Sequence, residues 1–172
     1  MLKKKVLLID ENDNEMGFAE KLKAHQLGLL HRAFSVFIFN DRGELLLQKR
    51  AQNKYHSAGL WSNTCCSHPV SKNIKKEAQK RLKKEMGIKC QLQQIFSFIY
   101  NAKIGDLTEN ELDYVFVGAY NSQPNLNKKE AEDFKWVDFK SLKNAITQNP
   151  KNYTEWFKLI YEKVFDYGKI NQ

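Results

Sequence analysis

IKKEAQKRLKKEMG, residues 74–87, is the stretch that decides the fold of this chain. One apolar stripe recurs at every fourth position: Ile74, Ala78, Leu82 and Met86. This spacing predicts an amphipathic helix over 74–86 that packs one face on a core. Gly87 is placed to end the helix, because glycine readily adopts the left-handed conformation of a C-terminal cap. The lysines between the apolar positions predict a solvated outer face.

The segments around this helix read mostly as strands. Apolar and β-branched runs predict strands at 5–10, 33–39, 44–49, 88–100, 111–120 and 134–139. A turn-forming cluster at 40–43 predicts a hairpin between the second and third. Further helices are expected at 15–25, 139–148 and 153–165, and a loop at 51–64. Without a regular βαβ repeat, the order predicts an α+β fold, a mixed β-sheet flanked by helices in a single domain over 1–172.

Composition narrows the class of protein. With 172 residues, 42% of them hydrophobic, the chain is long enough to form a globular core. The first apolar run stops at Asp10, too early for a signal peptide, and no segment reaches membrane-spanning length. Three cysteines form neither a disulfide framework nor a CxxC knuckle, so we expect free thiols and a cytoplasmic protein.

The charge of the chain indicates the chemistry of its partners. A net charge of +8 favours an anionic partner. The lysines are scattered and not interleaved with aromatic residues, which argues against a nucleic-acid partner. Two explanations of the charge remain: a site for a phosphorylated small molecule, or a solvated basic surface. We expect no membrane partner, and a monomer or weak dimer.

Two short motifs carry groups suited to chemistry. In the segment 63–69, Cys66 and His68 are two positions apart, so an extended backbone points both to one face and Cys65 to the other. Glu109 and Glu111 form a second same-face pair at the start of a strand. A thiol, an imidazole and two carboxylates together suit metal binding, proton transfer or both.

The helix resembles the second half of the Nudix box, R-E-U-x-E-E-x-G-U, in which U is a bulky apolar residue. Only one carboxylate of that set, Glu85, remains. The other family glutamates are replaced by Lys72, Arg81 and Lys84, and the glycine that begins the box is replaced by Cys66. Since Nudix hydrolysis needs those glutamates to hold divalent ions, the helix is expected to keep the shape and one magnesium contact without the hydrolytic equipment.

Over about residues 21–156 the chain resembles type I isopentenyl-diphosphate isomerases, which share the Nudix fold. The matching elements, in chain order, are Lys21-x-x-x-His25, His31-x-Ala33-Phe34-Ser35, Arg50-x-x-x-Lys54, Trp61-x-Asn63-x-x-Cys66-x-His68-Pro69, Arg81-x-x-x-Glu85-x-Gly87, Glu109-Asn110-Glu111 and Trp156. Their combined order and spacing carry the resemblance, since each element alone is weak. It implies isomerisation of isopentenyl diphosphate to dimethylallyl diphosphate in isoprenoid biosynthesis.

The resemblance also implies roles for individual residues. A divalent metal, zinc, manganese or magnesium, would be held by His25, His31, His68, Glu109 and Glu111. The remaining histidine, His56, is expected to be an ordinary core or surface residue. Acid–base catalysis would fall to Cys66 and Glu111, with donor and acceptor unassigned. Tyr100 would assist protonation, and the Trp156 ring would stabilise positive charge.

The substrate diphosphate would be held by four cations: Lys21, Arg50, Lys54 and Arg81. A magnesium ion between Glu85 and the phosphate oxygens would complete the site. Cys65 and Cys90 are expected to be buried as small hydrophobes. The alternatives are a Nudix-type hydrolase of a nucleoside diphosphate derivative and a non-enzymatic basic binding module.

Overall fold

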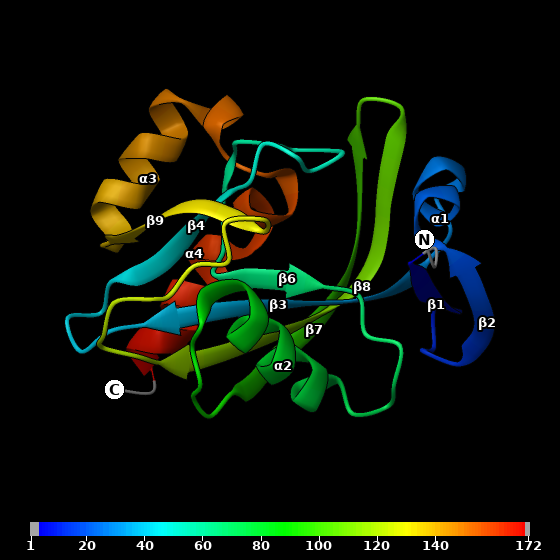
Figure 1. Cartoon of the computed structure of the whole chain (residues 1–172), viewed down its shortest axis with the longest axis horizontal. Helices are drawn as coiled ribbons and strands as arrows, with labels where there is room; N and C mark the ends of the chain where they lie inside the picture. The colour runs from blue at the N-terminus through cyan, green and yellow to red at the C-terminus, as the bar shows by residue number, and fades with distance from the viewer. Residues whose placement is uncertain (1–3, 171–172) are drawn as a thin grey trace.

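The computed structural model describes residues 4–170, and its central strand is β3 (His31–Phe39) (Figure 1). β3 pairs in parallel with β8 (Leu107–Ala119) along its full length. On its other edge, β3 pairs antiparallel with β6 (Cys65–Ser67). β3 therefore lies between the two strands that carry the thiol motif and the carboxylate motif.

The other elements extend this mixed sheet and cover it. The remaining strands are β1 (Lys5–Ile9), β2 (Glu15–Glu20), β4 (Leu45–Arg50), β5 (Trp61–Ser62), β7 (Gln93–Ile104) and β9 (Ala131–Val137). The helices are α1 (Lys21–Leu27), α2 (Ile74–Met86), α3 (Phe139–Gln148) and α4 (Glu155–Ile170), with a 3-10 turn at Pro150–Asn152. This is the expected α+β architecture.

Side chains of β3 alternate between two cores, one on each face of the sheet. Phe34 and Val36 pack with α2, whereas Phe37 packs with α4, where its ring lies 6.2 Å from that of Phe157. Because both faces are covered, nearly every residue of β3 is buried. The two helices thus hold the central strand in place from opposite sides (Figure 1).

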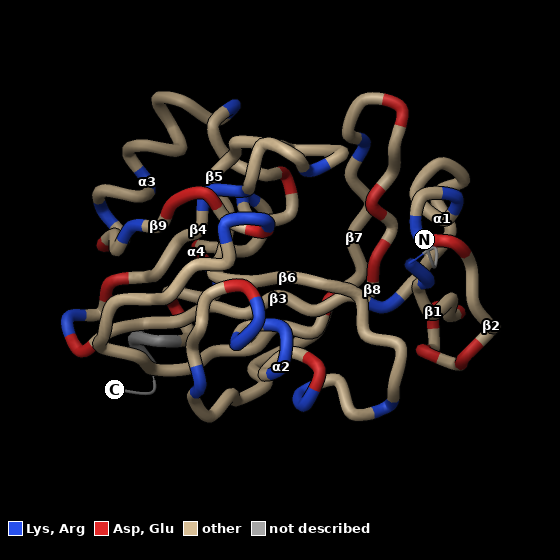
Figure 2. The backbone as a smooth tube through the Cα atoms, viewed as in Figure 1, with Lys and Arg blue, Asp and Glu red and all other residues tan. Residues whose placement is uncertain are grey.

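The helix α2 has the predicted bounds. The Asn73 side chain accepts a hydrogen bond from the Lys76 backbone N–H at its start. Gly87 ends it at φ 70°, and its N–H bonds to the Lys83 carbonyl. The solvated outer face is also confirmed, because four of its lysines are exposed: Lys75, Lys76, Lys80 and Lys83; Lys84 is exposed as well. Figure 2 shows in blue the Lys and Arg positions that recur along α2.

The helix predicted at 15–25 is wrong over its first half. Residues 15–20 form strand β2, paired with β1, and only 21–27 are helical. Met16 lies in this strand and is 67% exposed. Gly17, at φ 120°, fits the bent strand, and pairing with β1 outweighs the weak helical periodicity.

The turn predicted between 33–39 and 44–49 is present, but the two strands that it joins hardly pair with each other. The two strands pair only at Phe39 and Leu45, because β3 finds β8 and β6 as partners and β4 finds β9. Other bounds shift without a change of type. β7 begins at Gln93, later than expected, and β8 begins at Leu107, so that Glu109 lies inside the strand.

Further differences are smaller. The loop expected at 51–64 includes the two-residue strand β5, and the last helix begins at Glu155 after the 3-10 turn. Cys65 is buried as expected, whereas Cys90 is only partly buried. Among residues 4–170, no helix is both long and apolar enough to cross a bilayer.

Candidate metal centre and active-site cavity

The carboxylate pair lies on one face of β8. Glu109 and Glu111 are 3% and 6% exposed, so both carboxylates are withdrawn from solvent. The parallel register sets Glu111 directly beside His31 at the start of β3. The sheet topology thus brings together a histidine and a carboxylate that are far apart in the sequence.

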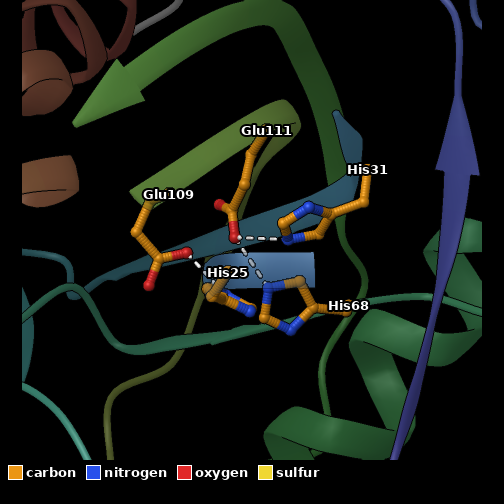
Figure 3. A group of neighbouring side chains, drawn as sticks. All are labelled: His25, His31, His68, Glu109 and Glu111. Carbon is orange, nitrogen blue, oxygen red and sulfur yellow. Dashed lines mark hydrogen bonds and ion pairs between the residues drawn. The ribbon is translucent and has the colours of Figure 1, made fainter. Parts of the chain in front are cut away.

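Two further histidines reach the same point from other elements (Figure 3). His25 lies in the last turn of α1, and its Nε2 is 2.9 Å from Glu109 Oε2. His68 follows β6 and places Nε2 2.7 Å from Glu111 Oε1, while His31 Nε2 is 3.3 Å from that oxygen. One ligand atom from each of these five residues lies within 4.8 Å of the others.

The donor set fits a divalent cation. Backbone carbonyls of Lys21 and Leu29 lie 2.6 and 2.7 Å from the Nδ1 atoms of His25 and His31. With Nδ1–H donating there, each Nε2 lone pair faces the cluster. Among residues 4–170, the Nε2 atoms of both histidines and Glu109 Oε2 are buried without a hydrogen-bond partner, although Glu109 Oε2 is close enough to His25 for an ion pair. Imidazole and carboxylate ligands of this kind suit a divalent metal.

A cavity of about 990 Å³ opens beside this cluster. Cys66 lines it, whereas Cys65 points to the α2 core, which is the expected division of the pair. Burial raises the pKa of Cys66 to about 12, even though nearby Arg50 acts in the opposite direction. The thiol is therefore protonated in this environment at neutral pH.

Tyr100 and Glu111 meet on the wall of the cavity. The Tyr100 hydroxyl donates a hydrogen bond of 2.6 Å to Glu111 Oε2. Burial raises the Glu111 pKa, but contacts with His31, Glu109 and Tyr100 outweigh it and lower the pKa to about 2. Glu111 thus directs one oxygen at two histidines and the other at a phenol.

Trp156 closes another side of the cavity. Its Nε1–H donates to Ser62 Oγ at 3.1 Å and to Asn63 Oδ1 at 3.3 Å, which fixes the plane of the indole. The Arg50 guanidinium lies 5.2 Å from the ring centroid. The indole is therefore fixed with one cation, the Arg50 guanidinium, over its ring.

The four predicted cations line the same cavity: Lys21, Arg50, Lys54 and Arg81. Glu85 is buried there and pairs with Arg81 at 2.5 Å. Arg81 also pairs with Glu130 at 3.0 Å, and Lys54 pairs with the same Glu130 oxygen. The structure thus brings every predicted site residue to this cavity or to the candidate metal-ligand cluster behind it.

Some residues at the site have no assigned role in the sequence analysis, and three of them contact residues that do. His56 lies 3.2 Å from Glu109, and Glu130 bridges two of the cations. Asp113 is buried two positions beyond Glu111 and accepts a hydrogen bond from Ser35. The alternation at 109, 111 and 113 was a usable signal for Asp113. The other two are brought to the site by tertiary contacts that leave no pattern in the sequence.

Comparison with known proteins places this geometry in a family. The family model described as NUDIX domain matches residues 29–157. Isopentenyl-diphosphate Delta-isomerase 2 of Aromatoleum aromaticum is 46% identical over 168 residues, covering 96% of this chain and 89% of the relative. A protein of the same name from Photorhabdus laumondii is 48% identical over 157 residues, covering 90% and 89%.

Solved structures agree on the fold. DR0079 from Deinococcus radiodurans superposes with a TM-score of 0.75 at 14% identity, covering 92% of this chain and 98% of that one. A MutT protein from Methanosarcina mazei gives a TM-score of 0.65 at 20% identity, covering 81% and 95%. At these identities the similarity establishes the Nudix-like fold alone.

Proposed function

Because the chain belongs to the NUDIX domain family and to the isopentenyl-diphosphate Delta-isomerases, we propose that Cys66 and Glu111 carry out its isomerisation of isopentenyl diphosphate. The observation that carries this proposal is that both groups line one cavity with the four cations. A thiol and a carboxylate are an acid–base pair, and the cations suit a diphosphate.

The reaction adds a proton to one carbon of the alkene and removes one from another. The two groups stand on β6 and β8, which flank β3, so a substrate in the cavity meets them from different strands. The Tyr100 hydroxyl, bonded to Glu111, supports proton transfer there. The Trp156 face, held by Ser62 and Asn63, stabilises the positive charge that develops on the carbon chain.

The substrate's diphosphate would lie among Lys21, Arg50, Lys54 and Arg81. Glu85 offers a carboxylate for a magnesium ion shared with the phosphates. A second divalent ion, zinc, manganese or magnesium, would be held by His25, His31, His68, Glu109 and Glu111. When bound, it supplies positive charge that tunes the proton affinity of Glu111. Metal analysis of the purified protein distinguishes the three elements.

The test is turnover of isopentenyl diphosphate with a divalent metal in deuterated water. We expect dimethylallyl diphosphate carrying solvent deuterium, and absence of both product and label contradicts the proposal. Cys66→Ala and Glu111→Gln should each nearly abolish turnover. Cys90→Ala is the matched control, since this thiol lies outside the residues lining the cavity, and it should keep full activity.

Hydrolysis of a nucleoside diphosphate derivative, the alternative activity, is not favoured. The relatives at 46% and 48% identity carry isomerase names, and the one retained box carboxylate, Glu85, is engaged by Arg81. We expect no phosphate release from a panel of nucleoside diphosphate derivatives with magnesium.

A further inference from the structure

His56 touches the candidate metal centre without belonging to it. It lies in the loop between β4 and β5, yet its side chain is only 8% exposed. Its Nε2 is 3.2 Å from Glu109 Oε1, while the other oxygen of Glu109 faces His25 Nε2 at 2.9 Å. Each oxygen of Glu109 therefore faces one imidazole.

The protonation pattern of His56 suits donation to Glu109. Its Nδ1 lies 3.4 Å from Ser57 Oγ, a hydroxyl that is able to donate a hydrogen bond. With Nδ1 accepting from Ser57, the ring proton resides on Nε2 and points at the carboxylate. This arrangement leaves Glu109 Oε2, which has no hydrogen-bond partner in the described part of the chain, directed into the ligand cluster.

The His56 ring is itself held in place by its neighbours. It meets the Trp156 ring edge to face at 5.8 Å and the Tyr55 ring at 4.4 Å. Arg50 Nη2 donates to the His56 carbonyl at 3.2 Å, and the same guanidinium lies over Trp156. His56 thus connects Glu109 to three residues that line the substrate cavity: Arg50, Tyr55 and Trp156.

We propose that His56 is a positioning residue of the metal centre: it orients the Glu109 carboxylate so that Oε2 faces the ion. The inference rests on the metal centre of the proposed function. Partners behind a metal ligand fix its orientation, and their loss typically lowers metal affinity by roughly 10-fold to 100-fold. His56 acts through Glu109 and is not one of the five clustered ligands.

The test compares variants that keep or remove the donor. His56→Phe keeps a ring between Trp156 and Tyr55 but removes the N–H, whereas His56→Gln retains an N–H donor. Metal affinity is measured by competition with a chelator on the metal-depleted, reloaded chain. We expect His56→Phe to weaken binding about 10-fold to 100-fold, and His56→Gln to weaken it much less. Tyr55→Phe, a change in the same loop that keeps the ring contacts, should bind metal as the wild type does.

The outcomes separate this inference from the proposed function. If the wild type isomerises its substrate and binds metal, but His56→Phe binds metal equally well, only the inference is wrong. Equal losses in the Phe and Gln variants also overturn it, because loop packing and not the donor would then be responsible. A wild type that binds no metal refutes the metal centre itself. Urea unfolding in chelator checks each fold, and His56→Leu replaces His56→Phe if that variant is unstable.

Discussion

Glu111 has two oxygens with different surroundings, and in the proposed function this division would let one carboxylate serve two purposes. Oε1 faces His31 and His68, whereas Oε2 accepts the Tyr100 hydroxyl. A metal ligand that also handles a proton needs such a separation, because the lone pairs directed at the ion are not available to the substrate. The pairing of Tyr100 with Glu111 across β7 and β8 builds it into the sheet register.

Tyr100→Phe tests the proton-transfer half of this arrangement. The change removes one hydrogen bond to a charged group, worth about 1.5–3 kcal/mol, so we expect kcat to fall roughly 10-fold to 100-fold. KM and bound metal should stay near wild-type values, because neither the cations nor the ligand-facing oxygen is altered. Steady-state kinetics and metal analysis check both.

Tyr114→Phe is the matched control for Tyr100→Phe. It removes a phenol that donates to Asp13, and it lies outside the residues lining the cavity. Its kcat should remain at the wild-type value. A KM rise without a kcat loss in Tyr100→Phe would show that the hydroxyl serves binding instead.

At the scale of elements, local patterns were predictable and long-range pairings were not. α2 was predicted at its observed bounds because its apolar stripe and Gly87 act within one helix. Cys66 and His68 were placed on one face because alternation is local to a strand. β2 was mistaken for helix, since only pairing with β1 makes it a strand. His56 was missed for the same reason, as a loop histidine has no periodicity that marks its contact with Glu109.

Gly87 joins α2 to the rest of the fold, and Gly87→Ala tests that junction. A Cβ there would lie 2.8 Å from both the backbone oxygen and the Cβ of Asn125. The left-handed conformation alone costs roughly 1–2 kcal/mol for a non-glycine residue. We expect Gly87→Ala to lose more unfolding free energy than this, because the clash with the Asn125 backbone adds to the conformational cost.

Gly43→Ala supplies the comparison for Gly87→Ala. Gly43 has the same φ of 70°, but nothing lies within 4 Å of an added Cβ. Urea unfolding should therefore show a smaller loss of unfolding free energy for Gly43→Ala than for Gly87→Ala. Equal losses would mean that the Asn125 segment moves aside without cost.

At the scale of the whole molecule, an ion in the candidate metal centre would tie the N-terminal segment to the sheet, because α1 lies beside β8 (Figure 1). Its ligands come from α1, β3, the end of β6 and β8. α1 has seven residues, fewer than the roughly 12–15 at which an isolated helix becomes even marginally stable in water. A small apolar cluster, Leu7, Ile9 and Leu112, is the core that docks this part of the chain. An ion bound to His25 would therefore add substantially to its order.

Metal removal should consequently loosen one region more than the others. An ion present at 100 times its dissociation constant stabilises the folded chain by about 2.7 kcal/mol. Because His25 is the ligand that α1 contributes, we expect faster backbone hydrogen exchange over 21–27 after chelation. Exchange in α2 should change little, because this helix packs in a different apolar core from the N-terminal segment and holds none of the five ligands. Hydrogen exchange followed by mass spectrometry, with and without chelator, measures both helices in one sample. An equal rise in both would indicate that the ion stabilises the fold globally, and no rise in either would show that α1 is held by its protein contacts alone.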